Sequence, residues 1–94
     1  MARATWNGQT VAESDIYEVV ENNVYFPPES VKREFLEPSD QTSHCPWKGE
    51  ARYYSLNVGG QRNEGAAWYY PQPKDAAKAI QGHVAFCKGV EVTR

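Results

Sequence analysis

The residue types best suited to chemistry gather in two short stretches of this chain. One is Cys45-Pro46-Trp47-Lys48-Gly49, which brings together a thiol, an indole and an amine, and the other is the aromatic run Trp68-Tyr69-Tyr70. A lysine among aromatic rings is suited to hold an anionic or carbonyl group, and burial that lowers its pKa would make it a base or a nucleophile. Two indoles can enclose a flat ring or a cation. These residue types predict a concave, aromatic-lined pocket between the two stretches.

Each residue of this predicted pocket has a role and a plain structural alternative. Lys48 and Cys45 are the candidate catalytic residues. The candidate ligand-binding residues are aromatic: Trp47, Tyr53, Trp68 and Tyr70. In the structural alternative, proline and glycine shape a turn, the tryptophans fill the core of a small domain, and the lysine ammonium reaches solvent along its apolar stem. The sequence leaves both interpretations open.

A metal site would have to draw on the histidines and cysteines of the chain: His44, Cys45, His83 and Cys87. They contain no Cys-x-x-Cys pair, and neighbours in an extended strand point to opposite faces, so His44 and Cys45 would bind one ion poorly. The chain also has neither an Asp-x-Asp pair for two-metal nucleotidyl transfer nor a glycine-rich phosphate loop. We therefore expect no metal and no cofactor.

The overall composition excludes several classes of protein. A net charge of −2 offers no basic surface for gripping nucleic acid without sequence preference. No apolar run is long enough to span a bilayer, and no hydrophobic stretch follows Arg3, as a secretory signal would require. We expect one domain over residues 1–94, located in the cytoplasm with reduced thiols, and with neither nucleic acid nor a membrane as a partner.

The distribution of β-branched and aromatic residues predicts a mainly β (α+β) fold. We expect a curled antiparallel sheet of about eight short strands, with two short helices. The expected strands are residues 4–6, 9–12, 16–20, 24–26, 52–58, 66–70, 83–87 and 90–92. Tight turns at Asn7-Gly8 and Gly59-Gly60 would close hairpins, and the last two strands would pair about Lys88-Gly89. Residues 39–49 are expected to form a polar connection.

Prolines mark the starts of the two expected helices. The first covers residues 29–36, with Val31 and Phe35 on one face. The second begins at Pro73 and ends at a left-handed Gly82. Its buried stripe consists of Ala76, Ala77 and Ile80.

The two-residue turn at 59–60 predicts the register of the central hairpin. It places Val58 opposite Gln61, Tyr53 opposite Ala66 and Ala51 opposite Trp68. One face then carries Tyr53, Trp68 and Tyr70, and the other carries Arg52, Tyr54, Ala67 and Tyr69.

Several strings in the sequence resemble one known family. They are Tyr25-Phe26-Pro27-Pro28, Thr42-Ser43-His44-Cys45-Pro46-Trp47-Lys48-Gly49, Ala66-Ala67-Trp68-Tyr69-Tyr70-Pro71-Gln72-Pro73 and Ile80-Gln81-Gly82-His83-Val84-Ala85-Phe86. The family is known as "domain of unknown function 427" and is also labelled nucleotidyltransferase-like; the resemblance extends over residues 11–92. In outline the family is similar to β-tent domains, small curled sheets that bind small molecules in an aromatic-lined cleft. The resemblance implies that the family's characteristic positions include Cys45, Trp47, Lys48, Tyr53, Trp68 and Tyr70.

Three functional hypotheses follow. The first is a small-molecule-binding domain, whether or not it is an enzyme, with its pocket around the turn at 45–49. The second is a non-enzymatic interaction module, monomeric or self-associating into a homodimer through an exposed sheet edge at residues 24–26. The third is nucleotidyl transfer, which the family label suggests and which no motif in this sequence supports.

Overall fold

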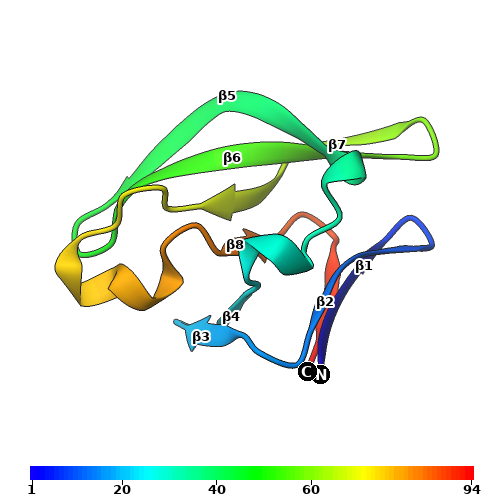
Figure 1. Ribbon diagram of the computed structural model, residues 1–94. Helices are drawn as coiled ribbons and strands as arrows, with labels where there is room; N and C mark the ends of the chain where they lie inside the picture. The colour runs from blue at the N-terminus through cyan, green and yellow to red at the C-terminus, as the bar shows by residue number, and fades with distance from the viewer.

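The computed structural model describes residues 1–94 and confirms a mainly β fold, in which the expected curled sheet is divided into three antiparallel sheets (Figure 1). The strands are β1 (Ala2–Trp6), β2 (Gln9–Ser14), β3 (Glu18–Val20), β4 (Asn23–Tyr25), β5 (Leu36–Cys45), β6 (Gly49–Val58), β7 (Gln61–Tyr69), β8 (Val84–Phe86) and β9 (Glu91–Thr93). Short 3-10 helices connect them: η1 (Pro28–Ser30), η2 (Arg33–Phe35) and η3 (Asp75–Ile80). The strand orders of the three sheets are β2-β1-β9, β3-β4 and β5-β6-β7-β8.

The first hairpin turns at Asn7 and Gly8, as the sequence predicts. Their φ angles are +49° and +79°, the left-handed pair of a turn whose twist matches that of the flanking strands. On its other edge β1 pairs with β9, with Ala4 opposite Val92. The two ends of the chain therefore lie close together (Figure 1).

The second hairpin, β3–β4, turns at Glu21 and Asn22, whose φ angles are +52° and +70°. β3 pairs only with β4 and leaves its other edge open. The segment after the turn was our expected contact surface for self-association, and this expectation is wrong. Val24 is 7% exposed and Tyr25 and Phe26 are fully buried, so the segment belongs to the core.

Strand β5 corrects our expectation of a polar connection over residues 39–49. It is an edge strand of the four-stranded sheet, and most of its side chains lie in solvent, so no hydrophobic alternation marks it in the sequence. Its pairing with β6 is interrupted between Pro38 and Thr42, where β5 arches away from β6 (Figure 1). A proline fits there because an edge strand need not donate every ladder hydrogen bond.

The hairpin of β6 and β7 begins in the predicted register, with Val58 opposite Gln61, and then shifts. Leu56 lies opposite Asn63 and Tyr54 lies opposite Ala67. Between these two pairs β6 advances by two residues and β7 by four, so the register shifts by two residues. The predicted pairing of Tyr53 with Ala66 is wrong, because Tyr53 lies opposite Trp68. An even shift keeps every side chain on its face, so the predicted sharing of faces is unaffected.

Both expected helices are wrong in type. Between η1 and η2, Val31 is extended, with φ −96° and ψ 132°, and it forms a bridge with Ala12. Because a helix this short is unstable without tertiary support, pairing with β2 prevails. The expected second helix is η3, which is kinked at Ala77 and leaves Ala76 exposed, outside the predicted stripe. The expected left-handed Gly82 is confirmed, with φ +71°.

The last two strands exist but do not pair with each other. β8 adds to β7 and β9 adds to β1, so the turn at Lys88 and Gly89 carries the chain from one sheet to another. The predicted hairpin is wrong because both strands find longer partners elsewhere.

Two apolar clusters lie on the two faces of β7 and β8. The larger core contains Phe26, Leu56, Ala67, Val84 and Phe86 among its members. The smaller core consists of Tyr25, Ala51, Tyr70, Ala77, Ile80 and Ala85. Because successive strand residues point to opposite faces, neighbours in the chain such as Tyr25 and Phe26 enter different cores.

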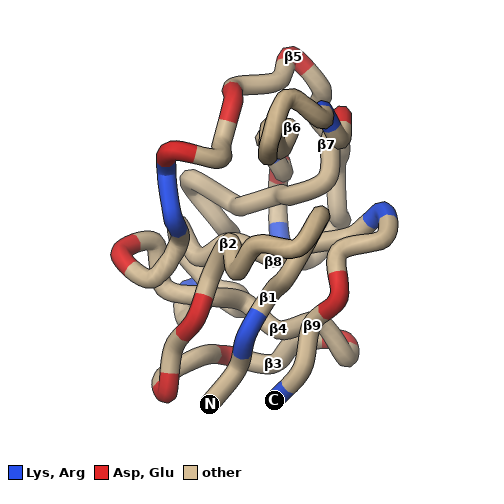
Figure 2. The backbone as a smooth tube through the Cα atoms, turned by 90° about the vertical axis from the view of Figure 1, so that its right-hand side faces the viewer, with Lys and Arg blue, Asp and Glu red and all other residues tan.

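Acidic and basic residues are interspersed along the backbone rather than gathered by sign (Figure 2). No helix in the structure is long and apolar enough to cross a membrane.

Candidate functional site

The turn at residues 45–49 is fastened to the segment that follows β7. The Lys74 backbone N–H donates to the Lys48 carbonyl at 2.9 Å, and Lys74 Nζ donates to the Pro46 carbonyl at 2.6 Å. Gly49 has φ +113°, and a Cβ at this position would lie 3.5 Å from the Gln72 carbonyl. That distance is an ordinary contact, so it is the positive φ that favours glycine here and allows the turn that follows Lys48.

The Lys48 side chain points into the protein and is only 7% exposed. Its ammonium forms an ion pair with Glu21 Oε1 from the β3–β4 turn. The same ammonium lies 5.1 Å from the centroid of the Trp47 ring and 5.7 Å from that of Tyr70. We call Lys48 with these two rings the Lys48 cage.

The charge state of Lys48 differs from our expectation. Burial is the largest single influence and lowers the pKa of Lys48, but the hydrogen bond with Glu21 and the neighbouring Tyr25, Tyr70 and Cys45 together outweigh it, so the pKa is raised above its ordinary value. The same hydrogen bond lowers the pKa of Glu21. The expected lowering of the Lys48 pKa is wrong, so Lys48 is a permanent cation at neutral pH and lacks the free amine that a base or nucleophile needs.

The remaining aromatic residues build the wall behind the cage. Trp68 Nε1 donates to the Tyr25 hydroxyl at 3.2 Å, and the two rings meet edge to face at 6.2 Å. Burial raises the pKa of both Tyr25 and Tyr70, so both phenols remain protonated at neutral pH. Tyr53 shares a hydrogen bond of 3.0 Å with Ser43, at the margin of this cluster.

The structure brings together most of the predicted site residues, but not around an opening. Trp68, Tyr53 and the half-buried Cys45 all pack against the smaller core. None of the three cavities of the protein is lined by residues 45–49, so the expected open pocket is absent at this turn. Glu21 and Tyr25 were missed, because both lie in the second hairpin and no spacing in the sequence links them to the turn.

The histidines and cysteines do not converge. No group of three or more His, Cys, Asp or Glu side chains is arranged to hold a metal ion. Cys87 lies away from the turn, where its thiol donates to the Gly65 carbonyl at 3.6 Å and burial raises the pKa of Cys87.

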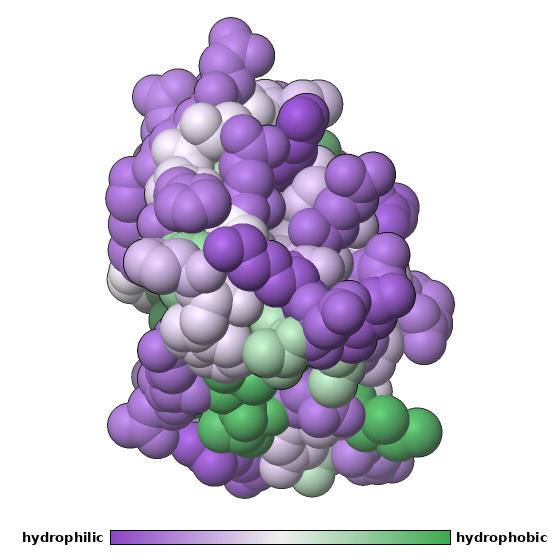
Figure 3. Space-filling view, turned by 90° about the vertical axis from the view of Figure 1, so that its left-hand side faces the viewer, coloured by the Kyte–Doolittle hydropathy of each residue, from purple (hydrophilic) through white to green (hydrophobic).

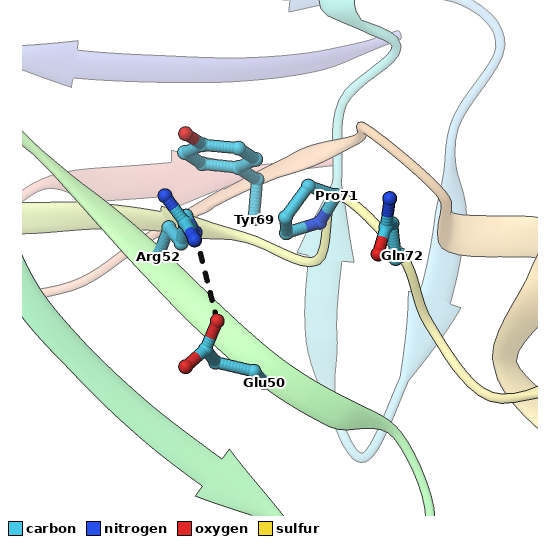
Figure 4. A pocket seen from close by; sticks show the side chains of 5 residues that line it. All are labelled: Glu50, Arg52, Tyr69, Pro71 and Gln72. Carbon is cyan, nitrogen blue, oxygen red and sulfur yellow. Dashed lines mark ion pairs between the residues drawn. The ribbon is translucent and has the colours of Figure 1, made fainter.

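A cavity of about 340 Å³ does lie nearby, on the other face of β6 and β7 (Figure 4). Its lining consists of Glu50, Arg52, Tyr69, Pro71 and Gln72, and we call it the Arg52 cavity. Arg52 Nε lies 3.6 Å from Glu50 Oε1, and each of these side chains is 57% exposed. The Tyr69 ring borders the cavity and stacks on Tyr54 with centroids 4.7 Å apart. Burial, and then the neighbouring Tyr54, raise the pKa of Tyr69.

Fold and site together define a small mainly β domain with two cores, a caged lysine on one face of its central sheet and a polar cavity on the other. The whole chain, residues 1–94, matches the family described as Domain of unknown function (DUF427), and the protein belongs to this family. No curated protein matches the sequence.

Proposed function

We propose that the protein binds a small polar molecule in the Arg52 cavity. The observation that carries the proposal is the convergence of a guanidinium, a carboxylate and a phenol ring on one space of about 340 Å³. This volume lies within the range of small-molecule sites, and a few well-placed polar groups are what orient a ligand in such a site. The proposed class of function is still small-molecule binding, as predicted. The proposed site lies on the face of β6 and β7 that carries Arg52 and Tyr69, opposite to the face predicted from the sequence.

The chemistry of the lining favours a ligand that carries an anionic group. Arg52 presents a planar fork of donors that matches a carboxylate or a phosphate. Its ion pair with Glu50 is long and solvent-exposed, and such pairs contribute little, so Arg52 is free to change partner. Glu50 accepts hydrogen bonds from amino or hydroxyl groups of the same ligand.

The short label of the family, NTP_transf_9, suggests nucleotides, which combine phosphate with amino and hydroxyl groups. Nucleotide binding would agree with the Arg52 lining. Nucleotidyl transfer has no comparable support, because it uses acidic side chains to hold metal ions. We therefore propose binding, without transfer.

Substitution of Arg52 tests this function. A panel of nucleoside monophosphates, inorganic phosphate and small carboxylates is titrated into 15N-labelled protein, and the amide shifts of residues 50, 52, 69 and 72 are followed. We expect at least one ligand to bind saturably there and Arg52→Gln to weaken it by tenfold or more. Arg62→Gln is the matched control, since Arg62 is 53% exposed and lies at the other end of the same hairpin. Equal binding by wild type and Arg52→Gln would refute the proposal.

Self-association stays a prediction, at a different edge from the one expected. The exposed large apolar residues include Ile16, 75% exposed, and Val19, 42% exposed, which lie before and within β3. Apolar side chains gather at the lower end of the molecule, at the level of the β3–β4 hairpin (Figure 3). The open edge of β3 is therefore the surface on which a second copy would pair.

A further inference from the structure

The turn at residues 45–49 already holds a carboxylate. The two oxygens of Glu21 have separate partners: Oε1 pairs with Lys48 Nζ, and Oε2 accepts from Trp47 Nε1 at 3.4 Å. Both donors come from consecutive residues of one turn, whereas the carboxylate comes from a distant hairpin. The turn thus supplies two hydrogen-bond donors for a single carboxylate, and in this structure that carboxylate is the side chain of Glu21.

The two members of the ion pair are unequally placed. The Lys48 side chain is 7% exposed and the Glu21 side chain is 54% exposed. A buried ammonium needs an anionic partner, because removing an unpaired charge from water costs a large amount of free energy. The anion itself stands at the surface, so a carboxylate from solution can reach the same position once Glu21 moves aside.

Glu21 lies in an exposed turn that follows the short strand β3. β3 is three residues long, pairs only with β4 and has an open edge, whereas β4 is held in the protein by the buried Val24 and Tyr25. Glu21 also adopts a φ of +52°, which residues other than glycine seldom adopt. Displacing Glu21 therefore disturbs only this turn and leaves both cores in place.

The surroundings of the ammonium favour a flat ligand. Trp47 is 40% exposed while its ring lies 5.1 Å from Lys48 Nζ. An indole with an open surface beside a cation can pack against an aromatic ring whose carboxylate reaches that cation.

We propose that the Lys48 cage is a binding site for a small aromatic carboxylate, which displaces the carboxylate of Glu21 and pairs with Lys48 and Trp47 in its place. Glu21 then acts as a built-in competitor, and its removal must raise the affinity of the site. The site is separate from the Arg52 cavity, because it lies beside Tyr70 whereas the cavity is lined by Tyr69, and adjacent strand residues face opposite ways.

Titration of benzoate tests the proposal, followed at the Trp47 indole N–H in a two-dimensional 15N spectrum. Acetate and chloride at equal ionic strength are the comparison anions. We expect benzoate to shift this resonance saturably in the wild type, to bind at least tenfold more tightly to Glu21→Ala, and to bind more tightly than acetate. Glu18→Ala is the matched control, since Glu18 is an exposed carboxylate of the same hairpin, and it should bind benzoate like the wild type.

Three results would overturn the proposal. They are equal benzoate affinity of wild type and Glu21→Ala, a response no larger than that to chloride, and retention of the response in a folded Lys48→Met variant. Loss of the response in Arg52→Gln but not in Lys48→Met would assign benzoate to the Arg52 cavity and would also overturn it.

A measurement on the unmodified protein keeps the proposal testable should Glu21→Ala fail to fold. Displacement frees Glu21 from Lys48, so saturating benzoate should raise the pKa of Glu21 toward its ordinary value, as followed by the 13C resonance of its side-chain carboxyl. An unchanged Glu21 pKa at saturation would show that Glu21 keeps its place and would refute displacement.

Discussion

A buried ammonium needs a counter-charge, and Lys48 finds it in Glu21, 27 positions earlier in the chain. Two of the aromatic residues expected near Lys48 do lie beside its ammonium: Trp47 is its neighbour in the chain, and Tyr70 directly follows β7. The sequence could not predict Glu21, because the contact depends on how the second hairpin folds across the turn. Glu21 is the largest of the groups that raise the Lys48 pKa, with Tyr25, Tyr70 and Cys45 adding to it, and the raised pKa changes the chemistry assigned to this residue.

The pH dependence of stability should show this pair directly. The folded-state pKa of Glu21 lies below its ordinary 4.5, so the stabilisation is present above pH 4.5 and is lost as the pH falls through the folded value. The folded-state pKa of Lys48 lies above 10.5, so the stabilisation is present below pH 10.5 and is lost as the pH rises through the folded value. Urea unfolding of wild type and Glu21→Gln should therefore differ by a constant free energy between these limits. A difference that does not shrink in acid would contradict the assignment.

Among the elements, the hairpin turns at Asn7-Gly8 and Gly59-Gly60 were predicted correctly, whereas the hairpin about Lys88-Gly89 and the register of the central hairpin were not. Asn7-Gly8 and Gly59-Gly60 require left-handed backbone, a local property that the residue types reveal. The shift inside the β6–β7 hairpin depends on Gly65, with φ +64°, and on a hydroxyl ten residues away, Ser55. β5 was not predicted because an exposed edge strand needs no apolar face. The first expected helix did not form because pairing of Val31 with Ala12 outweighs its weak local preference.

We predict that Ser55→Ala destabilises the protein through this shifted register. Ser55 is fully buried, and its Oγ accepts from the Gly65 backbone N–H at 3.1 Å. Alanine leaves that N–H unpaired away from water, which costs about 1–3 kcal/mol in the free energy of unfolding. Ser43→Ala is the control, since its hydrogen bond to Tyr53 is exposed and its loss should cost no more than about 0.5 kcal/mol. Equal effects of the two substitutions in urea unfolding would argue against a structural role for Ser55.

At the scale of the whole molecule, the two cores share one set of strands. Val84 and Phe86 of β8 enter the larger core, while Ala85 between them enters the smaller one. Tyr25 and Phe26 divide in the same way, and the two rings contact Trp68 and Phe86 respectively. Neither core can therefore lose its strands without opening the other, and this coupling predicts a single cooperative unfolding unit.

A small cavity in the smaller core should consequently weaken both cores equally. Ile80 is 1% exposed, and Ile80→Val removes one buried methylene, which costs about 0.5–1.5 kcal/mol. Fluorotryptophan labelling separates the cores by position, because Trp6 packs against the larger core and Trp68 against the smaller. In urea the 19F resonances of both indoles should report one midpoint in the wild type and one common, lower midpoint in Ile80→Val. Movement of the Trp68 midpoint alone would show that the cores unfold separately and that the shared strands do not couple them.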